Sequence, residues 1–400
     1  MNSFFNQAQQ YLFILLGVFI PTSIAATNIL IACLSICWIL EGKYKEKYKY
    51  IKSSKWMLSI FGLISLYILG LFWGDNHANS LWQFQRLALL LLFPVLGTLI
   101  LHQKTLKKGI ISFLITTFIS ALIAIGINWE IISPLDEYFS FLDYDKFIPA
   151  FIIYNYHNVL LAISYAISLY LFLEKKTQYR QILILFIIVY AASIFTEKGR
   201  AGQVLFNLTS IFYIVYYNRK SILRIGFLLT LLLSFLFCVY TFTDVYKKRL
   251  YVATKIIENN KNLDPYHIKR GKIVLDQRFI FAKESLIRII ERPILGHGTG
   301  SFGSIFKKEV KQLSNVKTHI TPHNQYLYVW FEIGIFGLAL LISIFYYQIR
   351  DLFKKKDGIH RVVLPASFMF LMLIDSYFFI FILTAAYIYL FTIYNRYQSE

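Results

Sequence analysis

Repeated apolar runs, each long enough to cross a lipid bilayer, constrain the fold of this chain more than any other feature of its sequence. A transmembrane helix needs about 20 consecutive, mostly apolar residues. Several near-uncharged runs meet that requirement, and the run that begins at Gln325 is the longest of them. We therefore predict an all-α fold, that of a polytopic helical membrane protein.

The composition excludes an ordinary soluble domain. Hydrophobic residues make up 57% of the 400 residues, whereas charged residues make up only 16%. A soluble domain carries about 25% charged residues. The N-terminus has no basic segment before its first apolar run, so we do not expect a cleaved signal peptide.

The apolar runs predict about twelve membrane spans. They lie at about 11–25, 28–41, 56–73, 87–101, 109–127, 152–173, 181–196, 201–217, 225–242, 325–348, 362–378 and 380–395.

Basic residues predict how these spans are oriented. The formal net charge is +19, and Lys and Arg gather in alternate connections, for example in the run from Lys43 to Lys55. Cytoplasmic loops collect such residues, so both termini are expected on the cytoplasmic side. A nucleic-acid or lipid-binding patch is the alternative interpretation of the run after Lys43. We favour the topological interpretation and expect no nucleic-acid partner.

One long connection divides the chain into three parts. Residues 1–242 hold the first nine spans, residues 243–322 form a loop of 80 residues, and residues 323–400 hold the last three spans. This topology places the loop on the outer face. An apolar stripe from Leu275 to Ile289 predicts an amphipathic helix that ends before Pro293. Weaker helical patterns cover residues 244–260 and 301–313, so the loop is expected to be mainly helical.

A titratable side chain stands at the start of the span after the loop. His323 and Asn324 follow Pro322, which is tolerated in the first turn of a helix but not in its interior. Imidazole is the side chain best suited to exchange a proton near neutral pH. The sequence therefore places a candidate general base at the water boundary of a membrane helix.

Two arginines are predicted on the same outer face. Arg200 ends the short connection that begins at Glu197, and Arg278 lies on the amphipathic helix of the loop. A guanidinium group is a permanent, planar cation suited to a phosphate or diphosphate. Each arginine could equally be a boundary residue that reaches toward water. Taken together, they predict a site for an anionic group at the outer leaflet.

Other polar residues carry weaker signals. His157 and Asn158 lie within a span and form a secondary candidate, although we expect them to pack against another helix. His319 and His323 have the spacing of a metal pair, but Pro322 between them opposes a shared helical face. The three cysteines lie inside apolar runs. We expect no metal site, no nucleotide-binding loop and no cofactor.

The motif around His323 resembles the O-antigen ligase and O-antigen polymerase superfamily of bacterial lipid-linked-glycan transferases. That superfamily has His, then Asn, Ser or Gln, then nine residues and Gly-x-x-Gly. Here these positions are His323, Asn324, Gly334 and Gly337. Upstream, a helix that carries Arg278 leads to Pro293-Ile294-Leu295-Gly296-His297-Gly298, which is similar to the family's Pro-x-x-Gly-x-Gly run.

Arg200 matches the family's arginine at the start of the span before the large loop. The family favours Leu four residues later, whereas this chain has Val204 followed by Leu205. The resemblance is specific over residues 196–340 and only topological elsewhere.

The resemblance implies a GT-C-like glycosyltransferase in the bacterial inner membrane, with its active site facing the periplasm. The implied reaction moves a glycan from undecaprenyl diphosphate to lipid A-core or a related glycan acceptor, with no metal or nucleotide. His323 would accept the proton of the attacking hydroxyl, while Arg200 and Arg278 would neutralise the diphosphate. Asn324 would orient the imidazole or bind a sugar. In-line attack would invert the anomeric centre.

Three other functions remain open on the sequence. A second lipid-linked glycan as acceptor gives an O-antigen polymerase, and a protein acceptor gives a protein O-oligosaccharyltransferase. From a different class, the chain could be a transporter of lipid-linked sugars, which predicts inverted repeats and charges at mid-membrane. The complete His motif and the single late loop favour a ligase.

Overall fold

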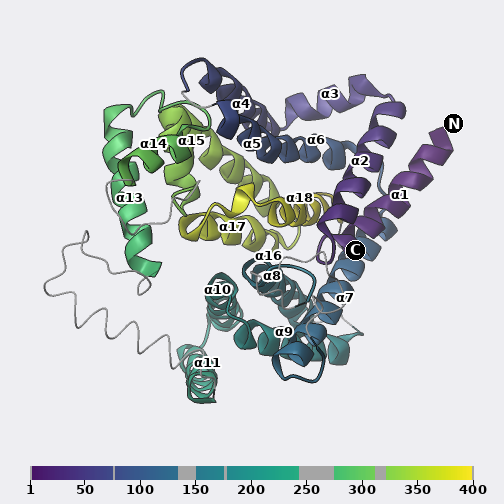
Figure 1. Ribbon diagram of the computed structural model, residues 1–400. Coiled ribbons are helices and arrows are strands. Elements are labelled where there is room, and N and C mark those ends of the chain that lie inside the picture. Colours follow the sequence, from purple (N-terminus) through teal and green to yellow (C-terminus); the bar gives the residue numbers. More distant parts are fainter. Residues whose placement is uncertain are drawn as a thin grey trace, which may run out of the picture. The chain divides into compact units, whose positions relative to one another are not determined.

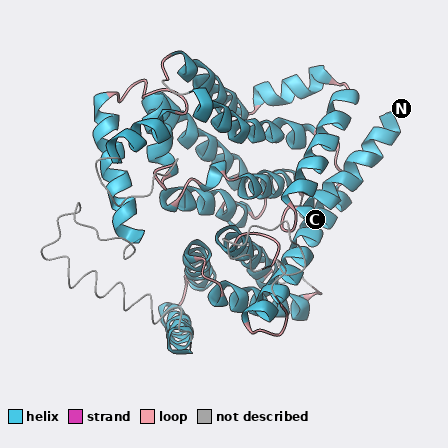
Figure 2. Cartoon of the chain, in the orientation of Figure 1, coloured by secondary structure: helices cyan, strands magenta, loops and turns pink. Residues whose placement is uncertain are grey.

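The computed structural model describes residues 2–74, 77–133, 150–174, 178–242, 274–310 and 321–398. All regular secondary structure in these ranges is helical (Figure 2). The predicted all-α fold is confirmed for this part of the chain.

The chain forms two compact units. Unit 1 comprises Met1–Ile20, Ile24–Ile110 and Asp264–Glu400, and unit 2 comprises Pro21–Ser23 and Ile111–Leu263. The predicted division at residues 242 and 322 is one of membrane topology, and it stays a prediction. The two units group residues that pack together, and they say nothing about which side of the membrane a segment lies on.

The helices are labelled in Figure 1. Unit 1 contains α1 (Asn2–Phe19), α2 (Ile24–Leu40), α3 (Tyr44–Ser53), α4 (Lys55–Leu69), η1 (Gly70–Phe72), α5 (His77–Ala88), η2 (Leu89–Leu91), α6 (Leu92–Thr98), α13 (Val274–Glu291), α14 (Ser301–Val310), α15 (Gln325–Phe353), α16 (Gly358–Arg361), α17 (Val363–Ile374), η4 (Tyr377–Phe379) and α18 (Phe381–Arg396). Helix α7 (Gln103–Asn128) begins in unit 1 and continues into unit 2, which also contains α8 (Tyr154–Leu173), α9 (Arg180–Thr196), α10 (Arg200–Asn218) and α11 (Ile222–Phe242).

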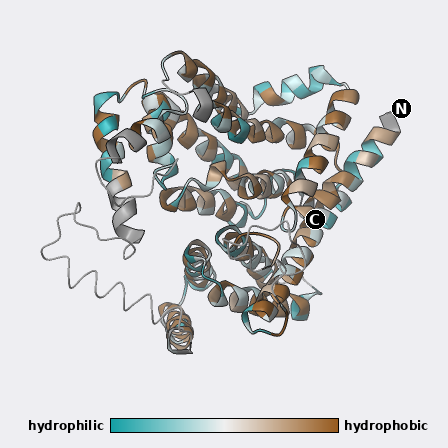
Figure 3. Cartoon of the chain, viewed as in Figure 1, coloured by the Kyte–Doolittle hydropathy of each residue, from teal (hydrophilic) through white to brown (hydrophobic). Residues whose placement is uncertain are grey.

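Six described helical segments are long and apolar enough to cross a membrane, and a seventh results if α2 and α3 form one span bent by 113°. Figure 3 shows long hydrophobic stretches along these helices. The protein is therefore a multi-pass helical membrane protein. Every predicted run overlaps a helix, but the count of about twelve spans and the side on which the loop lies stay predictions.

Two helices follow the predicted pattern of the loop. Helix α13 covers the amphipathic stripe and ends at Glu291, before Pro293, as predicted. Helix α14 covers most of the weaker pattern at 301–313. The third pattern, at 244–260, lies outside the described residues.

Helix α15 packs closely against α4 through small side chains. The hydroxyl of Ser343 donates to that of Ser59 at 2.8 Å, and Gly62 faces Leu340. Small residues allow helix backbones to approach closely in a membrane, where no hydrophobic effect drives helices together. This contact holds the long helix that begins beside His323.

Helix α15 is broken near its middle. Ile333 and Gly334 have non-helical backbone angles, and Gly334 has φ 70° and ψ −169°. The break lies against residues 293–300, which we call the glycine turn. The amide of Ile335 donates to the carbonyl oxygen of Pro293 at 3.0 Å. A carbonyl in the turn thus accepts a hydrogen bond from an amide that has no partner within the interrupted helix.

Amides of the glycine turn donate hydrogen bonds in the opposite direction, to carbonyl oxygens of α15. His297 N donates to Phe331 O and Gly298 N donates to Glu332 O, both at 2.8 Å. The carboxylate of Glu332, which is fully buried, accepts from Gly300 N at 3.0 Å. Turn and helix therefore satisfy each other's backbone groups in the protein interior.

A second surface of the glycine turn contacts the N-terminal helices of unit 1. Thr299 N donates to Gly70 O at 3.0 Å, and Ser80 Oγ donates to Thr299 O at 2.7 Å. Residues far apart in the sequence thus meet at one eight-residue segment. The glycine turn joins the regions around η1 and α5 to α15.

Close packing explains the glycines on both sides of this contact. A Cβ atom on Gly334 would lie 1.9 Å from the carbonyl oxygen of Ile294, and one on Gly298 would lie 2.3 Å from the Cα atom of Gly74. Both glycines also have positive φ, which favours a residue without Cβ. These glycines are required by packing.

We predict that Gly334→Ala strongly destabilises the protein. Backbone strain alone contributes about 1–3 kcal/mol at such a position, and the overlap with Ile294 adds to it. The midpoint of thermal unfolding of the detergent-purified protein measures the effect. Gly226→Ala in α11 is the matched control, because a Cβ atom added to Gly226 would have no neighbouring atom within 4 Å. Equal midpoints for the two variants would contradict the packing argument.

Candidate functional site

His323 stands immediately before α15 in an unusual backbone conformation. Its φ is 53°, a value that residues other than glycine rarely adopt. Asn324 follows as the N-cap, and its Oδ1 accepts from the amides of Tyr326 and Leu327, each at 3.0 Å. Its Nδ2 donates to Leu373 O in α17 at 3.2 Å. Asn324 therefore ties the backbone beside His323 to two helices.

A carboxylate lies beside the imidazole. Asp375 Oδ1 is 3.1 Å from His323 Nδ1, and both side chains are 23% exposed. Asp375 follows the last residue of α17, where its Oδ1 also accepts from Ser376 N at 2.7 Å. A carboxylate at this distance from a ring nitrogen forms an ion pair with an imidazole that takes up a proton. Both side chains are partly exposed, so the pair lies at the surface of the packed helices.

Sequence reasoning missed Asp375. One signal could have found it, because the residue lies inside the predicted span at 362–378, and an ionisable residue within a span is a candidate for function. Its contact with His323 could not have been read from the sequence, since His323 precedes α15, Asp375 follows α17, and no spacing relates the two.

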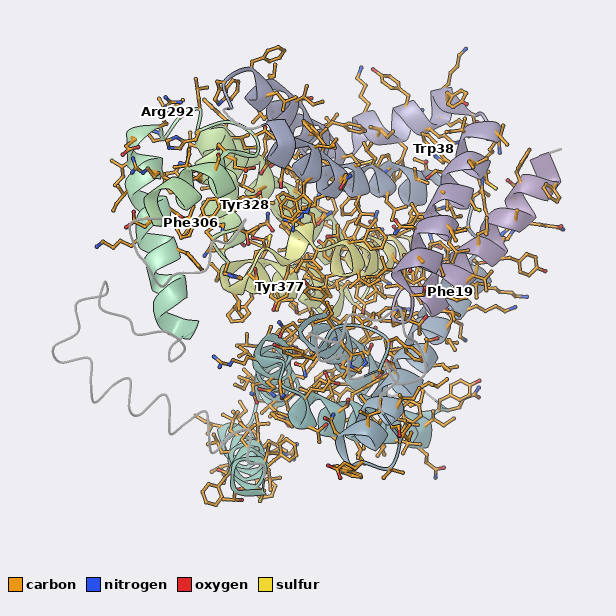
Figure 4. All side chains as sticks on the ribbon, in the orientation of Figure 1. Phe19, Trp38, Arg292, Phe306, Tyr328 and Tyr377 are labelled. Atoms are coloured by element: carbon orange, nitrogen blue, oxygen red, sulfur yellow. The ribbon has the colours of Figure 1, made fainter. Side chains whose placement is uncertain are left out.

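Aromatic side chains form an apolar wall beside the imidazole. The ring of Phe281 lies 5.7 Å from that of His323 and 4.9 Å from that of Phe306. Phe302 continues the cluster to Phe306 at 5.5 Å and Tyr328 at 5.8 Å. Figure 4 labels Phe306 and Tyr328, which come from α14 and α15. Phe281 of α13 thus packs directly against the candidate base, and Phe302 and Phe306 of α14 extend the apolar wall.

Helix α13 brings Arg278 into this region of the chain. Position 278 lies about one helical turn before Phe281 on that helix, and α13 packs against α15. The side chain of Arg278 lies outside the described part of the structure. Its predicted contact with an anionic group stays a prediction.

Arg200 is the first residue of α10, and its side chain is exposed. A cation at the positive end of a helix gains nothing from the helix dipole, so helix stability does not account for its place. A guanidinium group and the backbone amides at a helix N-terminus both attract an anion. Arg200 belongs to unit 2 and His323 to unit 1, so the convergence of the two stays a prediction.

His157 and Asn158 are buried in unit 2. His157 Nδ1 lies 2.7 Å from Glu197 Oε1, and Nε2 lies 2.7 Å from Ser120 Oγ. Asn158 Nδ2 donates to Ile194 O at 2.9 Å. Both residues thus join α8 to neighbouring elements, which agrees with the packing role expected from the sequence.

Among the described residues, no group of three or more His, Cys, Asp or Glu side chains is arranged to hold a metal ion. His319, the possible partner of His323 in such a group, lies outside the described residues.

We predict that Asn324→Ala weakens the start of α15, because it removes both cap hydrogen bonds. Loss of an N-cap costs about 0.5–2 kcal/mol. Asn324→Ser keeps a capping oxygen and should restore most of the stability. Thermal unfolding of the purified variants measures this, and equal loss in both would contradict a capping role.

The fold and the site define a class: multi-pass helical membrane proteins that carry a partly exposed imidazole–carboxylate pair beside the start of a helix. Within it, residues 184–342 match the family model described as O-antigen ligase. This region includes Arg200, Arg278, His323 and both glycines of the His motif.

Two curated proteins are similar to the chain. An uncharacterized protein of Haemophilus influenzae is 27% identical over 231 residues, which cover 53% of this chain and 55% of that protein. The O-antigen ligase of Salmonella typhimurium is 22% identical over 219 residues, which cover 52% of this chain and 50% of that protein. The chain spans about half the length of the curated relatives it matches. These findings confirm the predicted resemblance to the O-antigen ligase superfamily.

Proposed function

We propose that this protein is an O-antigen ligase-like glycosyltransferase. It transfers a glycan from undecaprenyl diphosphate to lipid A-core or a related acceptor at the periplasmic face of the inner membrane. The proposal includes about twelve spans with both termini in the cytoplasm. The observation that carries it is the partly exposed pair of His323 and Asp375, of which His323 lies in the region that matches the ligase family.

His323 acts as the general base of this reaction. An acceptor hydroxyl gives its proton to Nε2 while its oxygen attacks the anomeric carbon of the donor. The bond from that carbon to the diphosphate oxygen breaks, and undecaprenyl diphosphate leaves with the bonding electrons. Asp375 at Nδ1 stabilises the imidazolium that forms, an arrangement that supports base catalysis worth about 10²–10⁴-fold.

The arginines stabilise the leaving group. Charge grows on the diphosphate as the glycosidic bond breaks, and a guanidinium pairs with phosphate oxygens through two hydrogen bonds. The exposed place of Arg200 at a helix N-terminus supports this role. Arg278 is the second cation of the proposal, and Asn324 helps to hold the sugar beside His323. Because the donor carries its own leaving group, the reaction uses no nucleotide or metal.

Transfer by the detergent-purified protein tests the proposal. The donor is an undecaprenyl-diphosphate glycan, and separate reactions contain lipid A-core, a second lipid-linked glycan or a periplasmic protein, each with chelator and without ATP. We expect conjugation to lipid A-core that is lost in His323→Ala and falls at least about 100-fold in Arg200→Ala and Arg278→Ala.

Other outcomes lead to other functions. Lengthened glycan chains indicate a polymerase, and a glycosylated protein indicates a protein O-oligosaccharyltransferase. Donor binding without product in any reaction favours a transporter of lipid-linked sugars and removes the catalytic roles.

We predict that Asp375→Asn lowers the rate of transfer about 100-fold or more while donor binding changes little. The amide keeps the size of the side chain but does not stabilise an imidazolium. Asp351→Asn is the matched control, because Asp351 is a partly exposed carboxylate near the other end of α15. Initial rates for the three proteins measure the effect. A similar rate for Asp375→Asn and Asp351→Asn excludes Asp375 from the mechanism.

A further inference from the structure

Four buried polar side chains form a network in unit 2. Ser120, His157 and Glu197 are joined by two contacts of 2.7 Å, and Ser193 Oγ donates to Glu197 Oε1 at 3.0 Å. None of the four is more than 1% exposed. Buried polar groups are costly unless they are paired, and a paired network makes its surroundings rigid. Apolar side chains would fill the same space at less cost, so we looked for a part of the structure that this network holds in place.

The order of serine, histidine and glutamate is that of a hydrolase triad. Ser120 is fully buried, however, and a nucleophile must reach its substrate. The network therefore acts on its surroundings rather than on a substrate.

Glu197 begins the short turn that leads to Arg200. Gln203 Nε2 donates to the carbonyl oxygens of Ile194 at 3.1 Å and Glu197 at 3.2 Å, so the first turn of α10 is tied to the end of α9. The carboxylate of Glu197 is tied in turn to His157 in α8. The backbone that carries Arg200 is thus held from two sides.

Two glycines bring the same turn onto α8. A Cβ atom on Gly199 would lie 2.5 Å from Asn158 Cβ, and one on Gly202 would lie 2.2 Å from Asn158 O. The residues on either side of Arg200 therefore contact α8 directly. Arg200 itself is exposed.

We propose that Glu197 and His157 are positioning residues for Arg200. Their buried contact fixes the turn so that the guanidinium is directed at the donor diphosphate before substrate binds. This inference rests on the proposed role of Arg200. A displacement of about 1 Å in a positioned group can cost about 100-fold in rate, so loss of this support affects transfer without any contact to the substrate.

The variant Glu197→Ala tests the inference through kcat/KM for the undecaprenyl-diphosphate glycan with lipid A-core as acceptor. We expect a loss of about 10- to 100-fold, mainly as a lower kcat with a smaller change in the KM for the donor, because Arg200 stabilises charge that grows in the transition state. Glu197→Gln should stay within about threefold of wild type. Its amide oxygen still accepts from His157 and Ser193, and its NH2 replaces Oε2, which has no hydrogen-bond partner among the described residues.

The decisive measurement repeats Glu197→Ala in full-length protein that already carries Arg200→Ala. If Glu197 acts through Arg200, Glu197→Ala causes less than about a threefold further loss there, because the two effects are coupled. Tyr165→Phe is the matched control for a general packing defect. It removes a buried hydrogen bond of 2.8 Å to Ser210 between α8 and α10, away from the turn, and should leave transfer unchanged.

Three outcomes would overturn the inference. Equal loss from Glu197→Ala in both backgrounds places its effect elsewhere, while the proposed function stands. Equal loss from Tyr165→Phe assigns the effect to packing. Full transfer by Arg200→Ala removes the proposed role of Arg200 and this inference together. If Glu197→Ala does not fold, Ser193→Ala replaces it, since that variant removes only one hydrogen bond to the carboxylate.

Discussion

The exchange of backbone hydrogen bonds between the glycine turn and the broken helix α15 is the constraint on which the candidate site depends. The break leaves amides and carbonyls without helical partners, and in an apolar interior each unpaired group costs several kcal/mol. Residues 293–300 supply the partners from one side, through Pro293, His297 and Gly298. The same segment extends to Gly70 and Ser80. The two sequence motifs of the ligase resemblance, the run from Pro293 to Gly298 and the motif that ends in Gly334 and Gly337, thus contact each other directly.

The candidate catalytic residues of unit 1 lie at the ends of helices. His323 precedes α15 and Asp375 follows α17, so each residue has a backbone that its helix does not fully determine and a side chain that water can reach. Unit 2 follows a similar plan, since Arg200 begins α10 beside a buried network. In both units, a charged or titratable group stands at the end of a helix.

The helices were predictable because their signals are local. Apolar periodicity located the helices, and Pro293 marked the end of the amphipathic helix in the loop. The motif pointed to His323 without reference to any contact. Asp375 was missed because no spacing relates it to His323. The role of Gly334 in packing was also hidden, since it depends on Ile294, a residue from another segment.

The sequence by itself determined that this is a helical membrane protein, where its helices lie, and which superfamily it resembles, because hydropathy and motif spacing are properties of neighbouring residues. Only the tertiary structure decided that Asp375 is the partner of His323, that Asn324 donates to the carbonyl oxygen of Leu373 in α17, and that Glu197 is paired with His157. These are contacts between separate helices. They depend on how helices pack around unsatisfied polar groups, and no local pattern encodes that arrangement.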